Sequence, residues 1–333
     1  MSLSLLAIIA LSTIAAAGLC AAATRGYLRF LPAATVNDRS LHRRPVRTSA
    51  GLAIIAGSFA GWLLHVAIGG QAGLWPVMLG ASIASIVGWM DDRAGLSAGI
   101  RLCAEILIIA AILFHAFGAE GLLSPAGIAL GLAVLWFVNL FNFMDGSDGL
   151  AASQTILCLL PWMTAVHLGM TESTAEADAL MLALTGACLA FLFFNRPEAR
   201  LFMGDAGSLS IPLVAVGIAI FTPDPAEAGL ILLIGFAGFV TDASLTLALR
   251  IIRGERWWAA HRTHAYQLLA RRAGGHGAPL AALWLYGALW LTPIAIAAAS
   301  GRLTTGLALA AAYVPAIGGC AYVQWRYRSA LPR

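Results

Sequence analysis

A succession of long apolar runs, separated by short polar segments, constrains this chain more than any other feature of its sequence. Runs of about 20 apolar residues are long enough to cross a bilayer as helices. The 333 residues are 60% hydrophobic and only 11% charged, which is far outside the composition of soluble domains. The sequence therefore predicts an all-α polytopic membrane protein, with about eleven transmembrane helices in one integral membrane domain over residues 1–333. The predicted spans are 3–23, 51–69, 75–90, 102–118, 126–142, 150–169, 178–194, 208–222, 228–249, 279–300 and 303–325.

The distribution of arginine predicts the topology. The chain has no lysine, so all 20 basic residues are arginines, and 19 of them fall in alternate loops. Because basic residues are retained on the cytoplasmic side of a membrane, these loops are expected in the cytoplasm. The N-terminus is then outside and the C-terminus inside, which requires an odd number of spans. The opposite loops carry only Arg302 and several acids, such as Glu176, which are interpreted as ordinary solvated residues.

A polar stretch between two apolar runs is the strongest candidate for a functional site. It contains Asn139, Asn142, Asp145 and Asp148, at the predicted boundary between one span and the next. Ionisable groups at membrane depth are costly and indicate function. A polar hairpin is the plain alternative, but four polar groups within ten residues exceed what a turn needs.

Aspartates in three of the predicted cytoplasmic segments indicate a metal site. Unpaired, they would repel one another, and a divalent cation would relieve this repulsion; an all-oxygen set of ligands suits Mg²⁺ or Mn²⁺. Arginines and histidines on the same side suit phosphate oxygens. Together these groups indicate diphosphate chemistry, and their position at the bilayer surface indicates that one substrate is a lipid. The aspartates are Asp91, Asp92, Asp145, Asp148 and Asp205.

Plainer structural roles are open for several of these residues. Asp91 and Asp92 are also suited to capping a helix or anchoring it at the interface. Asp205, between two glycines, is suited to be the N-cap of the following span. His261 and His264 are also compatible with the surface of an amphipathic helix.

Four motifs occur in order along the chain: Asp91-Asp92, Asn139-x-x-Asn-x-x-Asp-Gly-x-Asp-Gly149, Phe202-Met-Gly-Asp-x-Gly-Ser208 and His261-Arg-x-His264. Taken together, they resemble the polyprenyl-phosphate N-acetylhexosamine-1-phosphate transferases, the MraY/WecA-like family also called glycosyltransferase family 4. The resemblance extends over about residues 38–272. The last motif, followed by Ala-Tyr-Gln, is most similar to the branch of the family that initiates O-antigen.

The resemblance implies an enzyme that transfers N-acetylhexosamine-1-phosphate from a UDP-sugar to undecaprenyl phosphate. It would release UMP and form undecaprenyl-diphospho-sugar, the first step of surface glycan assembly of the lipopolysaccharide O-antigen type. UDP-GlcNAc, or a 6-deoxy derivative such as UDP-FucNAc or UDP-QuiNAc, is the expected donor, and magnesium or manganese the expected cofactor. The implied location is the bacterial inner membrane, with an active site formed by cytoplasmic loops; a homodimer is an open alternative.

The resemblance also implies roles for the polar cluster. Asp205 would bind the metal, with Asn142 as a second ligand. Asp91 and Asp92 would handle the lipid phosphate and the metal, and Asp91 is the candidate base. Asp145 would belong to the same catalytic cluster.

Other residues would bind the nucleotide and the sugar by the same reasoning. Phe202 would stack on uracil, Asp148 would accept a hydrogen bond from it, and Asn195 would line the nucleotide pocket. His261 is also a catalytic candidate. The groups expected to hold the diphosphate or the sugar are His261, Arg262 and His264.

Other classes of protein are less consistent with the sequence. A transporter or lipid flippase places ionisable residues near the bilayer midplane, whereas here the clustered acids are at the ends of spans. Glu105 and Asp242 do lie inside apparent spans, and packing, pairing with arginine and catalysis are all open for them. A lipid phosphatase with His261 as nucleophile would leave the aspartates without a role. No motif that reads nucleic acid accompanies the net charge of +4.

Overall fold

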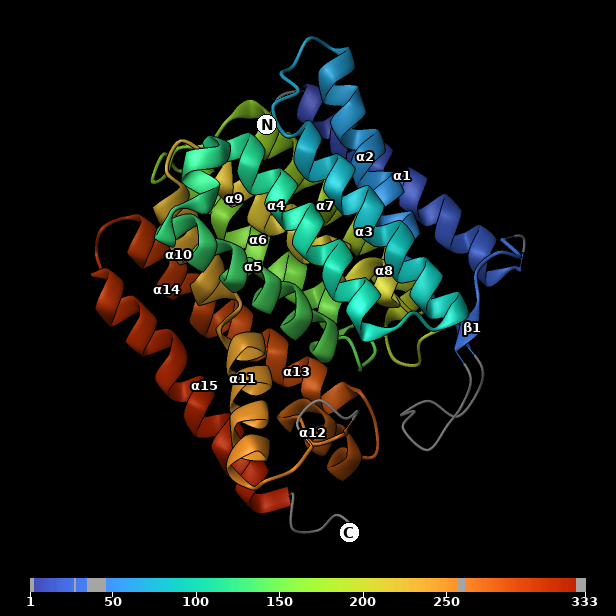
Figure 1. The fold of residues 1–333 in the computed structure, drawn as a ribbon, viewed down its shortest axis with the longest axis vertical. Coiled ribbons are helices and arrows are strands. Elements are labelled where there is room, and N and C mark those ends of the chain that lie inside the picture. Colours follow the sequence, from blue (N-terminus) through green and yellow to red (C-terminus); the bar gives the residue numbers. More distant parts are fainter. Residues whose placement is uncertain (1–2, 27, 35–45, 257–260, 328–333) are drawn as a thin grey trace.

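The computed structural model describes residues 3–26, 28–34, 46–256 and 261–327, which are mostly helical (Figure 1). Among the arginines used to predict topology, Arg39, Arg43, Arg44, Arg328 and Arg333 lie outside these residues. A two-residue antiparallel strand pair, β1 (Ala33–Ala34) with β2 (Val46–Arg47), and an isolated bridge between Arg47 and Leu201 depart from an all-α fold in the described part. The helices are α1 (Leu3–Thr24), α2 (Gly51–Ala67), α3 (Trp75–Ala94), α4 (Ala98–Leu123), α5 (Pro125–Met144), α6 (Leu150–His167), α7 (Ala175–Asn195), α8 (Asp205–Ser208), α9 (Ser210–Ile220), α10 (Pro225–Gly235), α11 (Ala237–Ile252), α12 (Ala265–Ala273), α13 (Gly277–Tyr286), the π-helix η1 (Gly287–Leu291), α14 (Thr292–Ala299) and α15 (Thr305–Tyr327).

The lengths and compositions of the helices confirm a polytopic helical membrane protein. Among the described residues, seven helices are long and apolar enough to span a membrane, and an eighth span results if α10 and α11 are counted together. The helix α2 and the segment Asp205–Ile220 are apolar but shorter. The number of eleven spans therefore stays a prediction.

The predicted span 228–249 is not one straight helix. The helix α10 ends at Gly235, α11 begins at Ala237, and their axes differ by 68°. The ring of Phe236, at the break, packs against Phe137 and Phe239. Because the apolar run continues through the bend, the hydropathy pattern does not reveal it. After the bend, α11 packs against α12 and α15, in the lower part of Figure 1.

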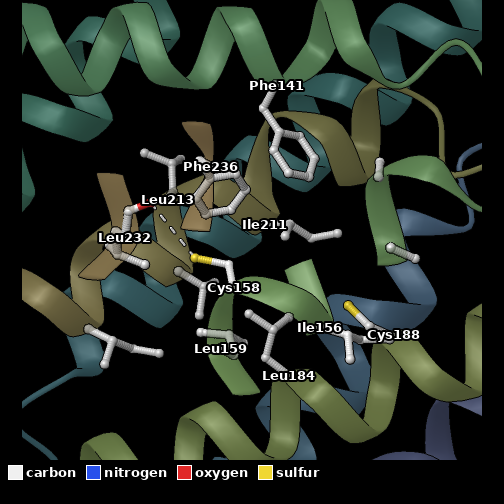
Figure 2. Packing of buried hydrophobic residues seen from close by; sticks show 14 of the residues in the cluster. Phe141, Ile156, Cys158, Leu159, Leu184, Cys188, Ile211, Leu213, Leu232 and Phe236 are labelled. Atoms are coloured by element: carbon white, nitrogen blue, oxygen red, sulfur yellow. Dashed lines mark hydrogen bonds between the residues drawn. The ribbon is translucent and has the colours of Figure 1, made fainter. Parts of the chain in front are cut away.

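The helices α6 and α7 form the centre of the bundle. They are buried over 72% and 67% of their most apolar stretches, against 17% for the peripheral α15. The helices α1 and α2 pack on α7, while α10 and α14 pack on α6. Figure 2 shows Cys158 and Cys188 among the leucines, isoleucines and phenylalanines of this core, as expected for cysteines in apolar runs. This rigid centre fixes the helix ends that carry the polar motifs.

Glu176, which we interpreted as a solvated acid, is in fact buried, with 4% of its surface exposed. Its carboxylate accepts hydrogen bonds from Trp62 Nε1 at 2.8 Å, from the Gly73 N–H at 2.8 Å and from the Leu74 N–H at 2.9 Å. Such bonds offset the cost of removing a carboxylate from water. Glu176 thus joins the start of α7 to α2 and to the connection between α2 and α3.

Candidate active site

Asp205 is the meeting point of three predicted motifs. Its Oδ1 accepts a hydrogen bond from Asn142 Nδ2 at 2.9 Å, and its Oδ2 lies 2.8 Å from Arg101 NH1. Its main-chain N–H donates to Asp92 Oδ1 at 3.2 Å. The N-cap of α8 is Gly204, and Asp205 is the first residue of the helix, with its carboxylate bound to Arg101 and Asn142, so the N-cap interpretation is wrong. The side chain faces α4 and α5 instead.

Two glycines allow α3 and the start of α8 to approach this closely. A Cβ on Gly88 of α3 would lie 2.2 Å from the Asp205 carbonyl oxygen, which is impossible without movement. Gly204 has a φ of +68°, a backbone conformation that L side chains rarely adopt. The position of Asp205 therefore depends on the absence of side chains at these two residues.

Asp91 and Asp92, at the end of α3, have different partners. Asp91 Oδ1 accepts a hydrogen bond from the Leu96 N–H at 2.5 Å, and its Oδ2 pairs with Arg101 NH1 at 2.6 Å. Asp92 Oδ2 accepts a hydrogen bond from Ser49 Oγ at 2.6 Å. Ser49 has a φ of +66°, and a strained backbone of this kind is often found at functional sites. The capping interpretation therefore describes part of what Asp91 does, but not its ion pair.

The cluster carries more negative charge than Arg101 neutralises. Asp145 is half-buried, and no described residue donates a hydrogen bond to its carboxylate. Burial, together with the charges of Asp205 and Asp92, raises the pKa of Asp145 well above its usual value. Burial also raises the pKa of Asp205 to about 7, with contributions from Asp91 and Asp92. These groups would ionise more readily beside a cation.

The residues of the cluster fit a magnesium or manganese ion by their chemistry. They supply oxygen ligands only, and they repel one another, which a divalent cation would relieve. Within the described residues, however, no three acidic, histidine or cysteine side chains are arranged to hold a metal. Arg101 lies between Asp91 and Asp205 instead.

Asp148 and Asn195, expected in the nucleotide pocket, tie two loops together. Asn195 is buried; its Oδ1 accepts the Gly149 N–H and its Nδ2 donates to the Leu201 carbonyl, both at 2.8 Å. Asp148 Oδ2 accepts the Ala199 N–H at 2.9 Å. Both residues therefore organise the walls of the site, and their contact with a nucleotide stays a prediction.

The backbone of Phe202 is fixed by the segment before α2. Its N–H donates to the Arg47 carbonyl at 2.8 Å, and its carbonyl accepts the Ala50 N–H at 3.0 Å. The side chain is half-buried, three residues before Asp205. Stacking of Phe202 on uracil stays a prediction.

The loop at residues 261–264 is held by Asp242 of α11. The two oxygens of Asp242 accept the N–H groups of Ala265 at 2.7 Å and Tyr266 at 2.9 Å. The ring of His264 is buried and stacks on the rings of Phe143 and Tyr266. For His264, the interpretation as a surface residue is therefore wrong.

The same loop contacts α15. Gln324 Nε2 donates to the Thr263 carbonyl at 2.5 Å and to Thr246 Oγ1 at 2.9 Å. His261 and Arg262 are half-buried, and the ring of His261 lies 4.8 Å, centre to centre, from that of His264. Their predicted contact with the diphosphate or the sugar is untested.

The sequence reasoning missed two partners of the site and left the role of a third open. Arg101 was used only to predict the topology. The short connection between α3 and α4 was a signal that Arg101 lies close to Asp91. Glu105, one turn further along α4, accepts a hydrogen bond from Asn139 Nδ2 at 2.6 Å, which assigns it a packing role. His276 Nδ1 accepts the Asp148 N–H at 3.1 Å. No motif marked His276.

The fold and the site define a class of protein: a helical membrane protein whose helix ends gather carboxylates, carboxamides and an arginine into one polar site. Residues 74–222, slightly less than half of the chain, match the family model of glycosyl transferase family 4. The matched segment includes the whole cluster from Asp91 to Asp205 and ends before the loop at 261–264. The resemblance drawn from the motifs is thereby confirmed for the family; the O-antigen branch stays a prediction.

Curated relatives agree with this assignment. The probable undecaprenyl-phosphate N-acetylglucosaminyl 1-phosphate transferase of Bacillus subtilis is 31% identical over 184 residues, covering 52% of this chain and 50% of that protein. A phospho-N-acetylmuramoyl-pentapeptide-transferase of Pelotomaculum thermopropionicum is 32% identical over 204 residues, covering 52% and 61%. The decaprenyl-phosphate N-acetylglucosaminephosphotransferase of Mycobacterium leprae is 26% identical over 304 residues, covering 79% and 75%. The chain thus spans half to just under two thirds of the first two relatives.

Proposed function

We propose that this protein transfers an N-acetylhexosamine-1-phosphate from a UDP-sugar to undecaprenyl phosphate and releases UMP. The observation that carries the proposal is the direct linkage of Asp91, Asp92, Asn142 and Asp205 around Arg101, in a chain of this family. The names of the relatives describe transfer of phospho-amino sugars, two of them to a polyprenyl phosphate. UDP-GlcNAc or a 6-deoxy derivative is the proposed donor, and initiation of O-antigen-type glycans the proposed role.

We further propose eleven spans in the bacterial inner membrane, with the active site on the cytoplasmic face. In support, the segments predicted to be cytoplasmic contact one another directly. Ser49 bonds to Asp92, Arg101 pairs with Asp205, and the Tyr266 hydroxyl donates to the Phe143 carbonyl at 3.1 Å. Segments that touch in this way lie on one side of the bundle. A reporter fused to the C-terminus should be active in the cytoplasm; activity outside only would reverse the topology.

In the proposed reaction, the residues of the cluster mainly position the reacting groups. The acceptor phosphate is already anionic, so alignment matters more than activation. Asp91, braced by the Leu96 N–H and by Arg101, is placed to orient this phosphate or to accept its proton. Asp205 and Asn142 would hold Mg²⁺ or Mn²⁺, which would neutralise charge on the diphosphate and on the departing UMP.

A direct displacement through a ternary complex is proposed in preference to a covalent enzyme intermediate. A covalent route needs an activated carboxylate nucleophile. Asp205 is the best placed candidate, but its oxygens already contact Arg101 and Asn142, and it is the proposed metal ligand. These contacts lower its nucleophilicity.

One structural observation bears on the transporter alternative. Broken helices are typical of transporters, and the ionisable Asp242 lies in α11, the second half of the bent α10–α11 pair. Both oxygens of this residue, however, accept hydrogen bonds from the backbone N–H groups of Ala265 and Tyr266, at the start of α12. The carboxylate of Asp242 is therefore occupied by the backbone, whereas an ion-binding residue at the bilayer midplane would be free to bind its ion. This favours an enzyme over a transporter.

The proposed function is tested by incubating the purified protein with undecaprenyl phosphate, magnesium and a panel of UDP-sugars, and measuring UMP. We expect release that requires both substrates and is fastest with one UDP-N-acetylhexosamine. UMP release that is independent of the lipid would contradict a transferase. No release with any donor would reject the proposal.

A further inference from the structure

Arg101 occupies the position between the two carboxylates that matter most to the proposed reaction. A single nitrogen, NH1, lies 2.6 Å from Asp91 Oδ2 and 2.8 Å from Asp205 Oδ2. A terminal guanidinium nitrogen carries two hydrogens, so both are directed at carboxylates. The side chain is 33% exposed, and within the described residues its Nε and NH2 donate to no protein group.

We propose that Arg101 is the internal counter-cation of Asp91 and Asp205, and that a divalent cation binds Asp205 only when Arg101 leaves that carboxylate. The inference rests on the proposed function, which supplies the need for a metal. Two cations that share one carboxylate oxygen repel each other strongly inside a protein. In the structure with Arg101 in place, no three histidine, cysteine, aspartate or glutamate side chains of the described residues are arranged to hold a metal.

The two ion pairs of Arg101 differ in how they are built. The pair with Asp91 is local: α3 ends at Gly95, which has a φ of +69°, and α4 begins at Ala98, so the turn returns Arg101 to Asp91. The Leu96 N–H braces the same carboxylate. The pair with Asp205 crosses 104 residues and depends on tertiary packing. Arg101 can therefore release Asp205 and keep Asp91, which is the exchange that the proposal requires.

Asp205 keeps its place when Arg101 is removed. Asn142 holds its side chain, and its main-chain N–H is bound to Asp92. The packing of its backbone against Gly88 is also unaffected. An Arg101→Met variant, which keeps an unbranched apolar side chain, therefore exposes the carboxylate without displacing it.

The test measures metal binding in the absence of substrate. The full chain, purified in detergent and stripped of divalent ions, is titrated with Mn²⁺, and free Mn²⁺ is measured by electron paramagnetic resonance. Arg101→Met should lower the Kd for Mn²⁺ about tenfold or more, because a repelling charge has been removed from the ligand. Arg101→Gln should do the same and covers the case in which the first variant misfolds.

A matched control removes an equal charge close by. The guanidinium of Arg93 lies over the ring of Trp89, and Arg93→Met should change the Kd by no more than about threefold, since exposed charges are screened. Adding Asp205→Asn to Arg101→Met should abolish the gain in affinity for Mn²⁺.

Two results would overturn the proposal. One is a folded Arg101 variant that binds Mn²⁺ no more tightly than the wild type or Arg93→Met, including the case in which none of them binds. The other is a gain in Mn²⁺ affinity that is still present in the double variant Arg101→Met, Asp205→Asn. Because no substrate is present, the outcome is independent of the transferase assay: a gain in affinity with no UMP release would reject the proposed function alone.

Discussion

The side-chain amide of Asn142 donates a hydrogen bond of 2.9 Å to the Asp205 carboxylate, across 63 residues of sequence. The same amide donates to Ser208 Oγ at 2.7 Å. The end of α5 is therefore bonded to both ends of the short helix α8. This links the central polar motif to the Phe-Met-Gly-Asp motif and fixes the carboxylate that we propose as the metal ligand.

The glycine at position 88 should be essential for this arrangement. Gly88→Ala would place a methyl group 2.2 Å from the Asp205 carbonyl oxygen, so α8 must shift. We expect UMP release to fall at least about tenfold, because small displacements of catalytic groups are costly. Gly229→Ala, at a helical glycine with open space around its Cβ position, should keep full activity and gain about 0.5–1 kcal/mol of stability. Equal activity of the two variants would contradict the close approach.

The charge of Asp205 should be required for turnover. Asp205→Asn keeps the shape of the side chain and removes its charge, and we expect kcat to fall about 100-fold or more at saturating magnesium. The matched control is Asp224→Asn at the start of α10, where Asp224 accepts the Glu227 N–H at 3.0 Å and asparagine caps equally well. Near-normal turnover of Asp205→Asn would remove this residue from the metal site.

The ring of Phe202 should affect binding of the donor more than the rate of the reaction. Stacking on a base contributes about 1–3 kcal/mol, so Phe202→Ala should raise the KM for the UDP-sugar roughly tenfold. The base is remote from the reacting phosphorus, and kcat should change less. Phe193→Ala, at an exposed ring that contacts Arg196 and Arg200, is the control and should leave KM unchanged. A loss confined to kcat would count against the stacking role.

Asp242 should stabilise the loop at 261–264. Asp242→Asn leaves one of the two backbone N–H groups of Ala265 and Tyr266 without its acceptor, at a cost of about 1–3 kcal/mol. We expect a lower Tm in detergent, measured by tryptophan fluorescence, together with a lower kcat/KM. Thr246→Val removes a hydroxyl that donates to the same carboxylate and accepts from Gln324 Nε2, but it leaves both backbone N–H groups with their acceptor and should have a smaller effect. A wild-type Tm for Asp242→Asn would show that the loop is held by other contacts.

The sequence predicted the helical class, the positions of the helices and the grouping of the aspartates, because hydrophobic length and charge placement are properties of the chain itself. It could not predict the bend at Phe236, since the apolar run continues through it. It also could not predict that Glu176 is buried, because the N–H groups of Trp62, Gly73 and Leu74 that satisfy it come from another part of the chain.

The partners of the site residues were the least predictable part. Motifs identified Asp91 and Asp205. One nitrogen of Arg101 joins the two carboxylates, and this contact depends on the packing of α3, α4 and α8, which no motif reveals. The role of Asp242 was open for the same reason: its partners, Ala265 and Tyr266, are reached only after the bend between α10 and α11.

The most direct test of the proposed function follows the phosphorus itself. The purified protein, freed of bound lipid, is given magnesium and a UDP-N-acetylhexosamine labelled in the β-phosphate, with and without undecaprenyl phosphate. With the lipid, we predict that the label enters the lipid fraction in a one-to-one ratio with released UMP; without it, we predict no UMP and no labelled protein. Label found as water-soluble phosphate or sugar phosphate would contradict a transferase, and labelled protein with stoichiometric UMP in the absence of lipid would contradict direct displacement.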